Sequence, residues 1–247
     1  LSRGLGDVYK RQYRNAAGGE ELRDTLCRES VTYTVRRNNI EVAASHRFCN
    51  ATPVTIAIYY GMQSMFEGET HVLTPGGAYT DWTEVAKAST FTKQEHPLFR
   101  RYVEKNRQGY QSTWLLPDGL GDHALLDGQD DIFIYAPYGK SYHKLIGNKR
   151  IKNGDKTCWR GVYTWFETPI ADDADLLCYE GSAGGHTAVF IDCKRACKRT
   201  LALPGYLDLR HFGTAEQNGG IRISAAGRNK LKIKAGAPGS CVLLLRE

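Results

Sequence analysis

The stretch Cys158–Ile170, with the sequence CWRGVYTWFETPI, predicts a β-strand and with it the fold class. Aromatic and β-branched residues fill it, and such residues favour strands. Alternation along a strand places Trp159, Tyr163 and Trp165 on one side. Such an aromatic ladder indicates either the core of a β-sandwich or a flat platform for a ring-shaped ligand such as a sugar. The sequence leaves both interpretations open.

Short strands separated by turn residues are expected along most of the chain. Two alternating runs, residues 31–36 and 40–45, flank residues 37–39 and predict a hairpin in which Asn38 and Asn39 supply the positive-φ turn positions. Further strands are predicted at residues 54–60, 70–73, 110–116, 131–136, 142–146, 175–179 and 186–193.

The C-terminal region predicts a three-stranded meander over residues 221–224, 231–234 and 241–245. Alternation places its apolar side chains on one face. The other face carries a basic set, which is expected to face solvent: Arg222, Lys232 and Lys234.

One segment has the pattern of a helix. Pro97 is tolerated in a first helical turn, and Leu98, Tyr102 and Val103 share one face at helical spacing. We therefore expect one short helix near residues 97–105. Because no strand–helix alternation is visible elsewhere, the sequence predicts an all-β fold, an antiparallel β-sandwich that is jelly-roll or supersandwich-like.

The composition favours anionic partners. The 247 residues carry a formal net charge of +6 and have a pI of about 8.9. No block of five or six like charges occurs, so nucleic-acid binding is not expected, and no apolar run is long enough to predict a membrane span. The seven cysteines are irregularly spaced, which predicts mainly buried free thiols. The one close pair, Cys193 and Cys197, lacks the second pair that a zinc site requires.

The first twelve residues, LSRGLGDVYKRQ, resemble translated sequencing-adaptor sequence found at the ends of proteins from metagenome assemblies. The resemblance implies that residues 1–12 are an artefactual tail. We expect residues 13–247 to form a single β-sandwich domain that can be the C-terminal part of a longer bacterial protein with an upstream domain. A secreted or periplasmic location is expected.

Three loop segments concentrate residues that carry acid–base chemistry: residues 59–71, 117–123 and 135–144. Tyr and His are the usual bases when a proton is removed next to a carboxylate, and Lys or Arg neutralises that carboxylate. The predicted catalytic residues are Glu67, His123, Tyr142 and His143. The predicted substrate-binding residues are Trp82, Trp114, Tyr138, Arg160, Trp165 and Glu167.

No cofactor and no metal site is predicted, with one qualification for calcium. Asp118 and Asp122 lie in a Gly-rich loop whose composition resembles a calcium-binding turn. The loop lacks the alternating carboxylate order of an EF-hand, so calcium near these two residues is only a secondary hypothesis.

With its aromatic residues, its positive charge and its acid–base side chains in loops, the chain resembles the β-sandwich portions of secreted bacterial polysaccharide lyases and glycoside hydrolases. The resemblance implies a carbohydrate-active domain that binds or processes an acidic polysaccharide, by lyase-like elimination or by glycoside hydrolysis, or that supports a catalytic domain. An acidic or a neutral polysaccharide is the expected partner. The alternative is a non-catalytic accessory or adhesion sandwich whose aromatic residues form the core.

Overall fold

The computed structural model describes residues 2–3, 8–14, 21–65, 69–74, 79–84, 89–92, 101–116, 131–136 and 140–245. Every regular element in this part of the chain is a β-strand, and each strand pair is antiparallel. The predicted all-β antiparallel class is therefore confirmed. These residues include no helix, and hence none with the length and apolarity that crossing a membrane requires.

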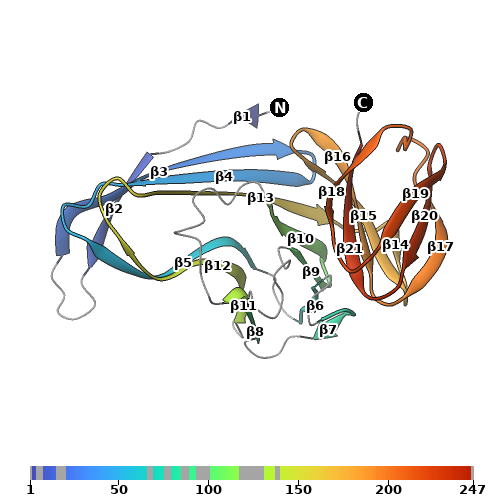
Figure 1. The fold of residues 1–247 in the computed structure, drawn as a ribbon, viewed down its shortest axis with the longest axis horizontal. Coiled ribbons are helices and arrows are strands. Elements are labelled where there is room, and N and C mark those ends of the chain that lie inside the picture. Colours follow the sequence, from blue (N-terminus) through green and yellow to red (C-terminus); the bar gives the residue numbers. More distant parts are fainter. Residues whose placement is uncertain are drawn as a thin grey trace.

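The described strands form four sheets, which we call A to D (Figure 1). Sheet A has the order β1-β3-β4-β13-β10-β9-β6-β7, with β2 also paired to β3: β1 (Ser2–Arg3), β2 (Val8–Arg14), β3 (Glu21–Arg36), β4 (Asn39–Phe48), β6 (His71–Leu73), β7 (Thr83–Glu84), β9 (Arg101–Asn106), β10 (Gly109–Leu115) and β13 (Lys156–Phe166). Sheet B has the order β5-β12-β11-β8: β5 (Val54–Met65), β8 (Ser89–Thr92), β11 (Asp131–Ala136) and β12 (Lys140–Ile151).

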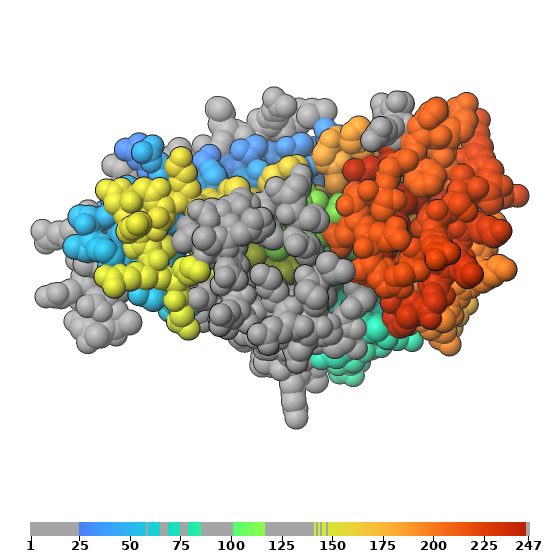
Figure 2. All heavy atoms as spheres, in the orientation of Figure 1, coloured from blue at the N-terminus to red at the C-terminus, as the bar shows by residue number. Residues whose placement is uncertain are grey.

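The C-terminal strands form the other two sheets. Sheet C has the order β14-β15-β16-β21-β18: β14 (Ala171–Asp172), β15 (Leu176–Ala183), β16 (His186–Cys193), β18 (Phe212–Gln217) and β21 (Gly239–Leu245). Sheet D has the order β17-β20-β19: β17 (Cys197–Ala202), β19 (Arg222–Gly227) and β20 (Lys230–Ala235). In the space-filling view this orange-to-red region forms one compact end of the molecule (Figure 2).

Three apolar clusters pack the sheets in the order B, A, C, D. One face of sheet A, including Trp159, packs on Leu145 and Ile146 of sheet B. Alternate residues on its other face, including Val162, pack on sheet C through Phe190. The opposite face of sheet C then packs on sheet D. Both faces of sheet A are thus buried along part of its length, because alternate side chains of each strand belong to different cores.

The helix predicted near residues 97–105 is wrong where the structure describes the segment. Residues 101–106 form β9, in which Tyr102 reaches Ser64 of sheet B and Val103 packs toward sheet C. Both faces of β9 are buried, so its apolar residues do not alternate with polar ones, and the run mimics a helical face. Residues 97–100 lie outside the described residues.

The predicted N-terminal hairpin is confirmed, with one correction to its turn. The turn consists of Arg37 and Asn38, and Arg36 pairs with Asn39. Arg37 adopts the positive φ of 44°, whereas Asn38 and Asn39 do not, so the predicted role of the asparagines is wrong.

The C-terminal meander is confirmed only for its first two strands. β19 and β20 pair, with Leu231 and Ile233 buried and Lys232 and Lys234 exposed, as predicted. However, β21 pairs with β16 and β18 in sheet C rather than with β20. Its CVLLL run is almost entirely buried, which is typical of a strand covered on both sides.

All seven cysteines are free thiols, and four of them are buried, in agreement with the sequence. The Sγ atoms of Cys193 and Cys197 lie 3.7 Å apart.

Strand β13 lies near the middle of sheet A, and its aromatic ladder runs from the core to the surface. Trp159 is 8% exposed, Tyr163 is partly buried and Trp165 is 38% exposed. The rings of Tyr163 and Trp165 stack with centroids 5.8 Å apart. The Trp159 end of the ladder therefore belongs to a core, as one of the two interpretations predicted, and the Trp165 end lies at the surface.

Gly161 occupies the ladder position where two buried groups meet. A Cβ atom there would lie 2.0 Å from Met62 Sδ and 3.0 Å from the backbone oxygen of Trp114. We expect Gly161→Ala to lower the free energy of unfolding by about 1–3 kcal/mol, since the core must shift to accept the methyl group. Chemical denaturation would measure this change in the free energy of unfolding. Gly205→Ala, where a Cβ meets nothing within 4 Å, is the control, and equal small effects of both changes would contradict the prediction.

Candidate functional site

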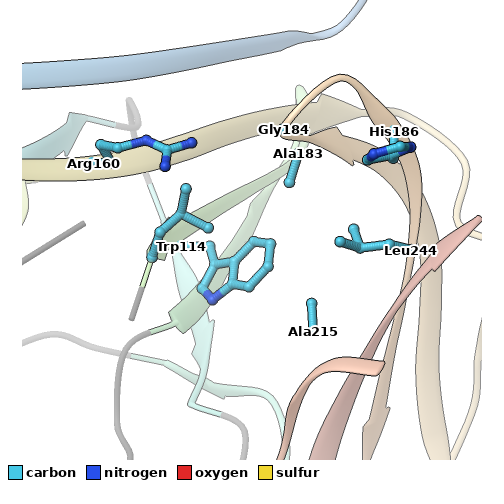
Figure 3. A pocket seen from close by; sticks show the side chains of 8 residues that line it. Trp114, Arg160, Ala183, Gly184, His186, Ala215 and Leu244 are labelled. Carbon is cyan, nitrogen blue, oxygen red and sulfur yellow. The ribbon is translucent and has the colours of Figure 1, made fainter. Parts of the chain in front are cut away.

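A hollow of about 320 Å³ lies where sheet C stops covering sheet A (Figure 3). Val162 of β13 is buried beneath sheet C, and Arg160, two residues earlier on the same face, emerges at the edge. The lining residues come from β10, β13, the β15–β16 hairpin, β18, β21 and the residue after β10: Trp114, Leu116, Arg160, Ala183, Gly184, His186, Ala215 and Leu244.

The indole of Trp114 forms an apolar wall of this hollow. Its ring packs edge-on against Phe190, with centroids 5.4 Å apart. Its Nε1 donates a hydrogen bond of 2.7 Å to Glu216 Oε2, which satisfies the only polar atom of the side chain. Because Trp114 is only 2% exposed, it belongs to the core as much as to the hollow.

Arg160 is held at the mouth of the hollow by Glu41 of β4. Arg160 Nη2 lies 2.7 Å from Glu41 Oε1, and Glu41 Oε2 accepts a hydrogen bond from the backbone nitrogen of Gly184 at 3.0 Å. Glu41 therefore links β4, β13 and the β15–β16 turn, and it fixes the direction of the guanidinium group. In Figure 3 this group and the Trp114 indole point into the same space.

His186 is exposed at the start of β16 and contributes an imidazole to the lining. It was not among the predicted site residues. Its signal in the sequence is the preceding pair Gly184-Gly185, whose positive φ values of 58° and 89° form the tight turn that presents it. The hollow thus combines an aromatic wall with a cation and an imidazole at its mouth.

The other predicted substrate-binding residues lie elsewhere. Trp165 is on the face of β13 opposite to Arg160, and Glu167 is exposed beyond the end of that strand. Trp82 lies beside β7, and Tyr138 lies outside the described residues. Of the predicted set, the structure therefore brings together only Trp114 and Arg160.

Trp82 belongs to a separate charged cluster centred on Asp172. Trp82 Nε1 donates to Asp172 Oδ1 at 2.9 Å, and Lys105, Tyr110 and Lys194 donate to the same carboxylate. Burial by itself would raise the pKa of Asp172, but these hydrogen bonds lower it to about 2. Its charge is thus locally satisfied, and the cluster has a structural role in fastening β14 to the edge of sheet A.

One of the predicted catalytic residues, His143, has a described side chain, and it does not line the hollow. His143 is fully buried between sheets A and B, with its ring 5.3 Å from that of Tyr102. Tyr142 lies in β12, and nothing is described of its side chain. Glu67 and His123 lie outside the described residues, as do Asp118 and Asp122 of the calcium hypothesis.

Among the described residues no group of three or more His, Cys, Asp or Glu side chains is placed to hold a metal ion. No protein-family model matches the chain, and no curated protein matches it.

Proposed function

We propose that this chain is a β-sandwich domain that binds an acidic polysaccharide in the hollow between sheets A and C. The observation that carries the proposal is the meeting of Trp114 and Arg160 in one hollow. Trp114, although only 2% exposed, contributes an apolar wall, and a guanidinium binds a carboxylate or sulfate through paired donors.

The packing order of the sheets supports the sandwich architecture, of supersandwich-like type. Sheets B, A, C and D are joined by successive apolar cores, and each core lies between two sheet faces. A scaffold of this kind keeps strand ends and hairpin turns rigid, so residues such as Arg160 and His186 keep their positions without a ligand.

The position of His143 excludes this predicted base from the hollow, where the imidazole present is that of His186. A general base must come within hydrogen-bond reach of the proton that it removes. Arg160 points away from sheet B, whereas His143 belongs to sheet B and its ring lies against Tyr102 of sheet A, so sheet A separates the two. The second candidate function, a lyase or hydrolase, is tested by incubating the chain with polygalacturonate and following unsaturated products and reducing ends.

Replacing Arg160 with Gln is expected to weaken the binding of polygalacturonate about tenfold, because one charge-assisted contact is lost. Isothermal titration calorimetry with the full chain would measure it, and neutral dextran should give no signal. Lys232→Gln, which removes an exposed cation from sheet D, is the control and should bind like the wild type.

Equal affinities of the wild type and Arg160→Gln would contradict the proposed site. Absence of any polysaccharide binding by the wild type would overturn the function itself. That result would favour the accessory sandwich with aromatics as core, for which the burial of Trp114 and Trp159 is the supporting observation.

A further inference from the structure

Beyond the edge of sheet C, the same face of sheet A continues as an exposed surface. It is formed by alternate residues of β3, β4 and β13, and we call it the ledge: Arg28, Ser30, Ser45, Arg47, Lys156, Cys158 and Arg160. A second hollow, of about 520 Å³, lies on the ledge around its first six members. It is also lined by three residues that alternate with them along the strands: Glu29, His46 and Thr157. The cores between the sheets leave this part of sheet A open to solvent.

Three cations stand in one row across the ledge. Arg28 of β3 is directly opposite Arg47 of β4, and Arg47 is directly opposite Lys156 of β13. Neighbouring strands lie about 4.8 Å apart, so the row spans about 10 Å. Like charges directly opposite one another on a sheet are destabilising, and a bound anion relieves that repulsion.

No acidic side chain neutralises this row within the described part of the chain. All three side chains are exposed, and none of them has an ion pair with a described carboxylate. Two acidic residues are adjacent to the row in sequence. Glu29 is buried and lies 2.9 Å from His46, and Asp155 accepts a hydrogen bond of 2.9 Å from the backbone nitrogen of Lys152. The three cations of the row thus remain open to an anionic ligand.

The neighbouring row of the ledge supplies hydrogen-bonding groups. Strand β13 connects the cation row to the first hollow. Ser30, Ser45 and Cys158 lie side by side across the three strands. Along β13, the same-face positions run from Lys156 through Cys158 to Arg160, a distance of about 13 Å at 3.3 Å per residue. Arg160 lines the first hollow, so cations mark both ends of this path.

We infer that the ledge is a binding site for a polyanionic glycan, whose negative groups occupy the Arg28–Arg47–Lys156 row while a further sugar reaches the hollow at Trp114. This inference rests on the proposed function and specifies its ligand as a chain that carries charges on successive sugars, rather than a neutral polysaccharide. Hydroxyl groups of Ser30 and Ser45 bind the oxygens of carboxylate or sulfate groups between the two ends.

Sheet D provides a matched control surface with the same charge. Lys198, Lys234 and Arg222 also form one row across three strands and are all exposed. Figure 1 places this sheet at the right-hand end of the molecule. A ligand that responds to charge alone would bind equally well to the two rows. A ligand that fits the ledge would bind to the ledge row more tightly than to the sheet D row.

The test compares the triple variant R28Q/R47Q/K156Q with the triple variant K198Q/K234Q/R222Q in the full chain. Polygalacturonate and dextran sulfate are titrated to separate carboxylate from sulfate recognition, with dextran and a single-stranded DNA oligomer as further arms. The ledge variant should lose about tenfold or more in affinity for at least one acidic polymer, and the sheet D variant less than about twofold. Both changes are on exposed residues, and thermal melting checks that both variants fold.

The outcomes separate the inference from the proposed function. Loss of polymer binding in Arg160→Gln but not in R28Q/R47Q/K156Q would overturn the inference about the ledge and leave the proposed function standing. Equal losses in both triple variants would show a response to charge without a site and would overturn it as well. Tighter binding of DNA than of either polymer would assign the ledge to nucleic acid. Absence of polysaccharide binding by the wild type would remove the proposed function and the ledge inference with it.

Discussion

An Arg101→Met variant is expected to lose about 3–5 kcal/mol of unfolding free energy, because the change leaves the buried carboxylate of Asp192 without its counter-ion. Arg101 begins β9 in sheet A, and Asp192 lies in β16 of sheet C. Their side chains are 2% and 1% exposed. Arg101 Nη1 donates to Asp192 Oδ2 at 2.7 Å and to the Tyr179 hydroxyl at 2.8 Å, and Nη2 donates to Asp192 Oδ1.

This ion pair crosses the core between sheets A and C, next to apolar residues that include Phe190. The guanidinium carbon lies 5.2 Å from the centre of the Phe190 ring. Buried ion pairs contribute little to the free energy of unfolding compared with apolar residues of the same size. Removal of one partner lowers that free energy strongly, because the other charge stays buried without a partner. We therefore expect the double variant Arg101→Met with Asp192→Leu to recover most of the loss.

Urea denaturation of the wild type, both single variants and the double variant would form a double-mutant cycle. A loss below about 1 kcal/mol for Arg101→Met would show that water reaches the carboxylate and would contradict the burial. Failure of the double variant to recover would indicate that the Tyr179 hydroxyl, which donates to Ser112 at 2.7 Å, depends on the guanidinium for its position.

Strand positions could be predicted from the sequence wherever one face of a strand is polar. In β20 the alternation of Lys230, Lys232 and Lys234 with Leu231 and Ile233 identifies both the strand and its buried face. Prediction from alternation fails where both faces of a strand are buried, because apolar and polar residues then no longer alternate. That is why β9 resembles a helix and why β21 could not be assigned to sheet C.

The cation row and the adjacent Ser30–Ser45–Cys158 row of the ledge depend on strand register, which the sequence predicts only in part. A three-residue connection at 37–39 would have placed Arg28 opposite Phe48. The observed two-residue turn places Arg28 opposite Arg47. The pairing of Arg47 with Lys156 joins strands that are distant in the sequence, and no local pattern encodes it. The net charge of +6 does not say where cations gather, and their position on sheet A required the fold.

The interface between sheets A and B contains a buried acid whose protonation links stability to pH. Glu104 of β9 is 1% exposed and accepts hydrogen bonds of 2.6 Å from the hydroxyls of Ser64 in β5 and Ser141 in β12. Burial raises the pKa of Glu104 to about 7, although these two hydrogen bonds act in the opposite direction. The folded protein therefore binds the proton of this carboxyl group more tightly than the unfolded chain does.

Because the pKa is raised in the folded state, this group opposes folding once it is ionised. Its effect is absent below about pH 4.5, where the carboxyl is protonated in both states, and grows as the pH rises toward 7. Each unit of pKa difference corresponds to about 1.4 kcal/mol, so the cost above pH 7 is about 3 kcal/mol. A Gln side chain resembles the protonated acid in shape, and the serine hydroxyls can rotate to accept from its amide group.

Glu104→Gln is therefore expected to be close to the wild type in stability at pH 5 and about 3 kcal/mol more stable at pH 8. Urea denaturation at several pH values between 5 and 8 would measure the difference in unfolding free energy between the variant and the wild type. The titration of all groups that the two proteins share cancels in this difference. Glu167→Gln, at an exposed position after β13, is the control and should give a difference that does not change with pH. A constant difference for Glu104→Gln would show that the carboxylate keeps contact with water. It would also show that sheets A and B meet through a hydrated interface rather than a dry one.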